Sequence, residues 1–219
     1  MSGYKLLVLD LDGTLLNDRK EITPATRCAL LQAQQQGITL VLASGRPTFS
    51  IRPLAEQLEL SRFGGFVLSY NGARIQHWST GELLQQTVLP QDVLPYLYDC
   101  SRRSGYAILA YQDGHVVTEQ ADDEYVKKVS QGNKMPIRKL TDFLKEVRLP
   151  LHKCLMVGEP DGLHQWEVKM AAEFGHRMNI YRSSPFIMEL VPLGIEKAHS
   201  LALLVQHLGL TPQQVIAVG

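Results

Sequence analysis

Three short apolar runs, separated by segments with helical patterning, dominate the first 70 residues. The runs cover residues 4–9, 38–44 and 65–70. They are apolar on both faces, which is typical of strands buried between layers of helices. Thr23 and Pro24 mark the start of a first helix and Gly37 its end, while Pro47 opens a second helix. This β-α-β-α-β order predicts a parallel sheet with right-handed crossovers.

The pattern changes after Tyr70. Asn71-Gly72 and Asp113-Gly114 are dipeptides typical of hairpin turns. Further expected elements are helices near 91–104, 121–131, 141–147 and 161–174 and strands at 152–157, 177–182 and 186–191. Hairpins mixed with helices indicate an α+β domain of roughly a hundred residues, a normal domain size.

The first pattern returns near the end of the chain, with a helix over about 196–208 and a buried strand over 215–218. The predicted fold class is therefore α/β, with a Rossmann-like parallel-sheet core split by an inserted α+β domain. We expect the core in 1–81 and 190–219 and the insertion in 82–189. Two chain crossings, placed near Gly81 and Pro192, would let the insertion move as a body.

Charge and cysteine content narrow the partners and the compartment. The 219 residues include 22 basic and 22 acidic side chains, so no basic excess calls for nucleic acid or an anionic membrane. Three scattered cysteines, with no CxxC spacing, favour a reducing cytoplasm over a disulfide scaffold. The N-terminal apolar stretch is too short for a membrane span and is no signal peptide. The sequence leaves the oligomeric state open.

Two acids, Asp10 and Asp12, stand directly at the end of the first strand. Ligands of open parallel sheets bind beyond the carboxyl ends of the strands, so this is a candidate active site. Close carboxylates repel each other, and a divalent cation removes that conflict. One acid then serves as ligand and nucleophile while the other moves protons. An aspartate nucleophile suits phosphoryl transfer, because water can hydrolyse the aspartyl-phosphate. The alternative is a polar turn after a strand.

Polar residues also follow the other two strands. Ser44, Gly45 and Arg46 come after the second strand, and Asn71 comes after the third. A hydroxyl, an unobstructed N–H and the start of a helix make a small phosphate cradle, to which Arg46 adds a charged fork. Taken alone, this segment is equally a good strand-to-helix loop. Lys197 lies at a helix start, against the helix dipole, which indicates a role in neutralising phosphate; a solvated lysine is the alternative.

Together these residues resemble the haloacid dehalogenase-like (HAD) superfamily of aspartate-nucleophile phosphatases. The first family motif, DxDGT, matches residues 10–14, and the second and third match Ser44 and Lys197. The segments "ASGRP" and "SYNGA", with the large insertion, look like the Cof-type branch with a C2-type cap. That branch mostly dephosphorylates sugar phosphates and similar small metabolites.

The resemblance implies a role for each matched residue. Asp10 would be the nucleophile and a Mg2+ ligand. Asp12 would be the general acid/base and a second ligand through its backbone carbonyl. Ser44 and Lys197 would hold the phosphoryl group, with Gly45 in the cradle. Arg46 and Asn71 would lie at the mouth of the site, near the cap.

The family's fourth motif is an acidic pair that follows a strand equivalent to "VIAVG". This sequence stops at Gly219, where the first of those acids would come next. We therefore expect a truncated chain, with weak Mg2+ binding and impaired catalysis in the 219-residue form.

Two rival functions belong to other classes. A non-catalytic phospho-ligand binding protein would keep Ser44, Gly45 and Lys197, but two repelling acids would weaken its binding. A dinucleotide-binding enzyme would need a G-x-G-x-x-G after the first strand, and the sequence has none there. The leading prediction is a Mg2+-dependent phosphatase for small phosphomonoesters.

Overall fold

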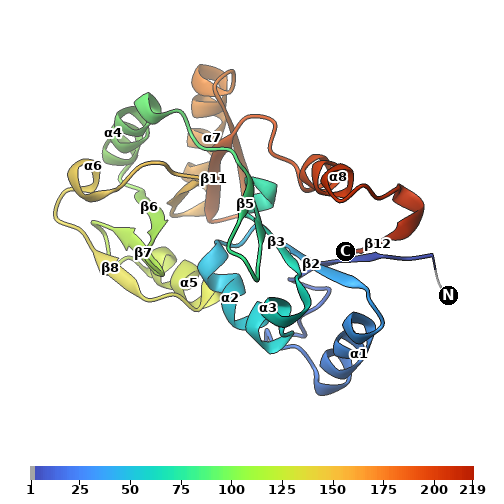
Figure 1. The fold of residues 1–219 in the computed structure, drawn as a ribbon. Coiled ribbons are helices and arrows are strands. Elements are labelled where there is room, and N and C mark those ends of the chain that lie inside the picture. The colour runs from blue at the N-terminus through green and yellow to red at the C-terminus, as the bar shows by residue number, and fades with distance from the viewer. Residues whose placement is uncertain (1–2) are drawn as a thin grey trace. The chain divides into compact units, whose positions relative to one another are not determined.

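The structure is a computed structural model that describes residues 3–219 (Figure 1). The described chain divides into two compact units. The core unit comprises the residues up to Gln86 together with Ile195–Gly219, and the inserted unit comprises Thr87–Gly194. The α/β fold class with a parallel core sheet is confirmed.

The core unit is built on a six-stranded sheet with the order β12-β1-β2-β3-β4-β5. The strands are β1 (Leu6–Asp10), β2 (Thr39–Ala43), β3 (Phe66–Ser69), β4 (Arg74–His77), β5 (Leu83–Gln86) and β12 (Val215–Val218). The first three and β12 run parallel, while β4 and β5 are antiparallel additions at one edge. Parallel strands place their carboxyl ends along one edge, so β1, β2 and β3 deliver the residues that follow them to the same place.

Helices cover both faces of this sheet. They are α1 (Pro24–Gln35), α2 (Thr48–Gln57), α3 (Leu60–Phe63) and α8 (Lys197–His207). Apolar side chains of α1, α2 and α3 form one cluster with Leu9, Leu40 and Leu42. Leu204 of α8 joins a second cluster with Val8. The strands are therefore apolar on both sides because each side meets a helical layer.

The inserted unit has a second six-stranded sheet with the order β10-β11-β9-β6-β7-β8. Its strands are β6 (Ala107–Gln112), β7 (His115–Thr118), β8 (Ile137–Lys139), β9 (Cys154–Val157), β10 (Met178–Ser184) and β11 (Ile187–Pro192). Its helices are α4 (Leu94–Ser104), α5 (Glu124–Asn133), α6 (Phe143–Glu146) and α7 (Pro160–Phe174). Residues of α4, α6 and α7 share one apolar cluster, and α5 packs in another with Leu109 and Leu155.

The inserted unit begins and ends five residues later in the structure than the sequence predicted. It covers Thr87–Gly194, whereas the expected range was 82–189. Leu83–Gln86 is strand β5, which pairs with β4 and so belongs to the core sheet. At the other crossing, β11 extends to Pro192 before the chain leaves the inserted unit. Gly81 lies in the β4–β5 turn, where its N–H donates to the His77 carbonyl, so it is not a crossing point.

None of the helices found in residues 3–219 has both the length and the apolar character needed to cross a bilayer.

Candidate active site

The predicted site residues that follow the strands belong to the core unit and lie at one end of its sheet. Asp10 is the last residue of β1, and Ser44 directly follows β2. Asn71 lies in the short 3-10 turn Tyr70–Gly72 after β3. Lys197 is the first residue of α8, which begins immediately after the inserted unit.

Asp10 and Lys197 form the central ion pair of the site. Lys197 Nζ lies 2.7 Å from Asp10 Oδ1, and the two side chains are partly exposed. A carboxylate that can act as a nucleophile or a metal ligand thus lies beside an ammonium that can bind phosphate oxygens. Lys197, which lies at the start of α8 where the helix dipole disfavours a cation, therefore has a carboxylate partner.

A second contact fixes the start of α8 against the turn after β3. Ser200, one turn into α8, donates a hydrogen bond from Oγ to the Gly72 carbonyl at 3.0 Å, and its side chain is buried. Gly72 has a φ of 92°, and a Cβ there would lie 2.3 Å from Ser200 Oγ. Only glycine fits both the backbone and the space. This contact holds the first turn of α8, and with it Lys197, at the strand ends.

Asp12 is held by two cations. Arg46 donates from Nε to Oδ2 at 2.8 Å and from Nη2 to Oδ1 at 2.7 Å, and Lys20 Nζ lies 2.8 Å from Oδ1. The Arg46 fork is the largest cause that lowers the pKa of Asp12 to about 2, against partial burial, and Lys20 lowers it further. Asp12 is therefore ionised at neutral pH in this structure. Gly13, with a φ of 79°, allows the turn between the acids and the following loop.

The loop after β2 is closely bonded to the turn after β3. The Ser44 carbonyl accepts from Asn71 N at 3.0 Å, and the Arg46 carbonyl accepts from Tyr70 N at 3.0 Å. A Cβ on Gly45 would lie 2.7 Å from Asn71 Oδ1, so a larger residue at position 45 would displace the Asn71 side chain. Ser44 is buried, and its Oγ accepts from Arg46 N at 3.1 Å. Its own hydroxyl proton can therefore point toward an anion.

A pocket of about 360 Å³ lies beside the Asp10–Lys197 pair. It is bordered by the ends of β1, β2 and β12 and by the first turn of α8. Apart from these two charged side chains the lining is apolar. The pair is thus open to solvent on one side and bounded by apolar residues around it.

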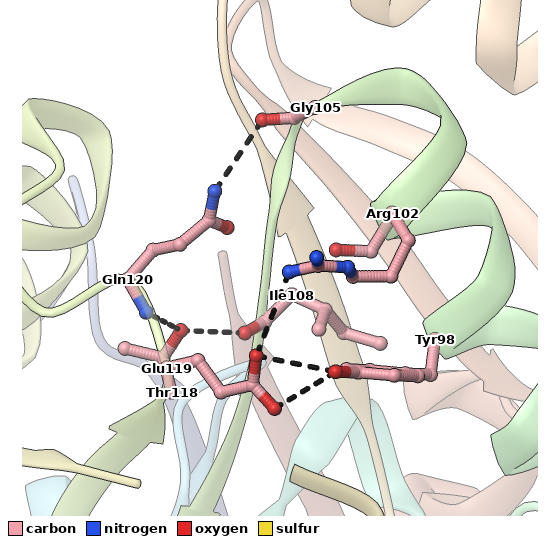
Figure 2. A pocket seen from close by; sticks show the side chains of 8 residues that line it. Tyr98, Arg102, Gly105, Ile108, Thr118, Glu119 and Gln120 are labelled. Atoms are coloured by element: carbon pink, nitrogen blue, oxygen red, sulfur yellow. Dashed lines mark hydrogen bonds and ion pairs between the residues drawn. The ribbon is translucent and has the colours of Figure 1, made fainter. Parts of the chain in front are cut away.

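The inserted unit has its own small pocket, of about 50 Å³, shown in Figure 2. Glu119 accepts from Tyr98 Oη at 2.9 Å and from Phe143 N at 2.7 Å, and Arg102 lies at ion-pair distance. Thr118 Oγ1 donates to the Ile108 carbonyl at 2.7 Å. These groups bond mainly to one another, which is typical of a structural network.

The site offers the type of ligand atoms that Mg2+ prefers. The Asp10 carboxylate and the Asp12 backbone carbonyl are hard oxygen donors, and Mg2+ commonly binds one or two carboxylates together with waters and substrate phosphate. The Asp12 carboxylate, by contrast, already binds Arg46 and Lys20. Within residues 3–219 no group of three or more His, Cys, Asp or Glu side chains is placed to enclose a metal ion.

The sequence analysis did not identify Lys20 as part of the site. It lies eight residues after Asp12 in a polar loop, and no motif or periodicity marks it. Arg46 was expected to face phosphate, but in the structure its fork binds Asp12. The roles of the other predicted residues stay predictions.

A family model described as haloacid dehalogenase-like hydrolase matches residues 7–219. The chain belongs to this family. Among proteins similar to this HAD-like hydrolase is the putative phosphatase YxeH of Bacillus subtilis, 30% identical over 99% of this chain and 80% of the relative. An HMP-PP phosphatase of Serratia proteamaculans is 26% identical over 99% of this chain and 77% of its own length.

A solved structure of a haloacid dehalogenase-like hydrolase from Bacteroides thetaiotaomicron superposes with a TM-score of 0.97. It is 48% identical, over 99% of this chain and 81% of that one. The resemblance predicted from the motifs is therefore confirmed. The family and the phosphatase names of its relatives identify this HAD-like hydrolase as a phosphoric monoester hydrolase.

Proposed function

We propose that this chain hydrolyses small phosphomonoesters, such as sugar phosphates and related metabolites, with Mg2+ and through an aspartyl-phosphate on Asp10. The observation that carries the proposal is the 2.7 Å pair of Asp10 and Lys197 at the end of β1, with Asp12 two residues further on. A carboxylate is a suitable nucleophile, and the ammonium beside it can neutralise the incoming phosphoryl group.

In the first step an Asp10 oxygen attacks phosphorus, the ester P–O bond breaks, and the leaving oxygen takes up a proton. Mg2+, held by the Asp10 carboxylate and the Asp12 carbonyl, would supply charge neutralisation for the phosphoryl oxygens. Ser44 and the Gly45 N–H, at the start of α2, would hold those oxygens, and Asn71 would border the cradle.

Asp12 serves both steps from its place beside Asp10. An approaching phosphate dianion raises its pKa by repulsion, so that it can carry the proton for the leaving group. In the second step its carboxylate takes a proton from water, which attacks the aspartyl-phosphate and releases inorganic phosphate. The ionised Asp12 of this structure is in the state needed for the second step.

The inserted unit is proposed as the cap that selects the substrate. This follows from the resemblance to the Cof-type branch and from the unit's own compact core. A B. subtilis relative, 31% identical, is named as a phosphatase of a phosphoribitylaminouracil. Such names support a small phosphorylated metabolite as the substrate class. The three free cysteines support the predicted cytoplasmic location.

The test is hydrolysis of p-nitrophenyl phosphate by the chain and by its Asp10→Asn variant, with Mg2+ and with excess EDTA. We expect Asp10→Asn to lower turnover at least about a thousandfold while the fold is retained. Rapid acid quenching with radiolabelled substrate should trap label on the parent chain and none on the variant. Phosphate binding that Asp10→Asn strengthens, with no label trapped on the parent chain, would favour the phospho-ligand binding alternative.

A further inference from the structure

The two cations on Asp12 differ in how exposed their side chains are. The Arg46 side chain is only 10% exposed, and its fork binds both oxygens of Asp12. Its remaining nitrogen, Nη1, lies 3.5 Å from Ser50 Oγ. Lys20, by contrast, is 46% exposed, and its Nζ lies 2.8 Å from Oδ1. Arg46 thus fixes Asp12, whereas Lys20 is the cation that a bound molecule can reach.

A compact turn places Lys20 in this position. Asn17 Oδ1 accepts from the backbone N–H groups of Arg19 and Glu21, both at 3.0 Å. The Asn17 carbonyl accepts from Lys20 N at 2.8 Å, and Asn17 N donates to the Glu21 carbonyl at 3.0 Å. Lys20 itself has a φ of 58°, a left-handed conformation that lysine rarely adopts. Buried apolar side chains anchor the flanks of the turn, namely Leu15, Leu16 and Ile22.

The position of Lys20 relative to Asp12 determines what it would contact. A leaving-group oxygen that exchanges a proton with Asp12 must lie about 2.7 Å from that carboxylate. Since Lys20 Nζ is 2.8 Å from Oδ1, a leaving-group oxygen bonded to Oδ1 lies within about 5.5 Å of the ammonium. An atom one or two bonds further along the leaving group can then reach hydrogen-bond distance of the ammonium. An ammonium has three donors, so it can bind Asp12 and a substrate oxygen together.

We propose that Lys20 is a specificity-determining residue that favours leaving groups with an anionic group next to the scissile oxygen, as in a diphosphate ester. This inference rests on the proposed function, because it requires Asp12 to face the leaving group. The charges agree with it: three cations, Lys20, Arg46 and Lys197, lie on two carboxylates. An exposed ion pair contributes little to stability, so the Lys20–Asp12 contact is not needed to hold the fold.

The test compares binding of two stable probes by calorimetry in the presence of Mg2+. Methylphosphonate carries only the group that is transferred, and methylenediphosphonate adds an anionic leaving group. The preference for methylenediphosphonate is the Kd of methylphosphonate divided by the Kd of methylenediphosphonate. We expect Lys20→Met to lower this ratio about tenfold to hundredfold. Lys20→Arg should keep most of the preference. Arg19→Met, which removes a neighbouring cation of the same turn, is the matched control and should leave the ratio unchanged.

Each outcome decides the question. A Lys20→Met chain that keeps the parent ratio within about twofold would overturn the inference, as would equal weakening of both probes, which indicates general phosphate binding. The p-nitrophenyl phosphate assay with Asp10→Asn reports on the proposed function separately. Loss of the diphosphonate preference in Lys20→Met, together with hydrolysis of p-nitrophenyl phosphate by the parent chain that Asp10→Asn abolishes, would support both.

Discussion

The ammonium of Lys197 lies 2.7 Å from the Asp10 carboxylate although 187 positions separate the two residues in the chain. The contact exists because α8 resumes the core unit at Ile195 and packs its apolar face on the sheet that contains β1. The Ser200 hydroxyl bonded to the Gly72 carbonyl fixes the start of that helix. The distance therefore depends on α8 packing as well as on Lys197 itself.

Replacing Lys197 should impair catalysis and leave stability nearly unchanged. Lys197→Met removes the charge that faces Asp10, so we expect kcat/KM for p-nitrophenyl phosphate to fall about a hundredfold or more. The side chain is 41% exposed, so thermal unfolding should shift by only a few degrees. Lys5→Met, a lysine outside the site, is the control. Full activity in a folded Lys197→Met chain would contradict the assignment.

Arg46 should control the titration of Asp12. The folded pKa, about 2, lies below the ordinary value of 3.8. The stabilisation is therefore present above about pH 4 and is lost as the pH falls toward 2. Because the Asp12 carboxyl is nearly half exposed, this contribution to the free energy of unfolding is below about 1 kcal/mol. Carboxyl-carbon NMR should show the midpoint rise in Arg46→Met, rise less in Lys20→Met, and stay in place in Arg52→Met.

Gly72 should tolerate no side chain. Gly72→Ala forces a residue with Cβ into a φ of 92° and against Ser200 Oγ, so we expect a loss of about 2–4 kcal/mol in the free energy of unfolding. Gly209→Ala is the matched control. Its φ is 63° but no atom lies within 4 Å of the added Cβ, so about 1 kcal/mol is expected. Equal losses in urea unfolding would show that the Ser200 contact does not matter.

The inserted unit contains a buried ion pair, and we expect the effects of replacing its two residues on the free energy of unfolding to be coupled. Lys153 Nζ lies 2.7 Å from Glu189 Oε2, and both residues are buried. Lys153→Met leaves a buried carboxylate without its cation and should cost about 3–5 kcal/mol. The double variant Lys153→Met/Glu189→Leu should recover most of that loss, because neither charge remains. Urea unfolding of the four chains of this cycle measures the coupling, and strictly additive losses would refute it.

The three thiols should differ in reactivity. Cys28 is exposed, whereas Cys100 and Cys154 are buried, and burial raises the pKa of Cys154 to about 12. The thiolate is the reactive form, so an alkylating reagent at pH 8 should label Cys28 rapidly and Cys154 only after unfolding. Mass spectrometry of digested samples reads this directly. Rapid labelling of Cys154 in the native chain would contradict its burial.

Most elements were predictable because their signals are local. The apolar runs of β1, β2 and β3 and the N-cap at Thr23 put these elements within one or two residues of the structure. The helix α3 and the strand β8 were missed, since four and three residues are too few to show a period. β8 also pairs with β7 in parallel across the intervening helix α5, so no local hairpin pattern marks it.

The arrangement of the site was predictable only in part. Parallel strands bring Asp10, Ser44 and Asn71 to one edge by topology, and the sequence pattern is sufficient for that. Asp12 contacts Arg46 and Lys20 because of the path that the loop after β1 takes. No periodic sequence pattern predicts that path. The unit boundary was placed too early because β5 shares the hairpin pattern of the inserted unit.

The pairing of β1 between β2 and β12 has a consequence for the nascent chain. All strands of the inserted unit precede β12 in the chain, so they emerge from the ribosome before β12 does. During that interval the outer edge of β1 presents unpaired N–H and carbonyl groups, which can pair with strands of other chains. Pairing with β12 (Val215–Val218) then covers that edge of β1.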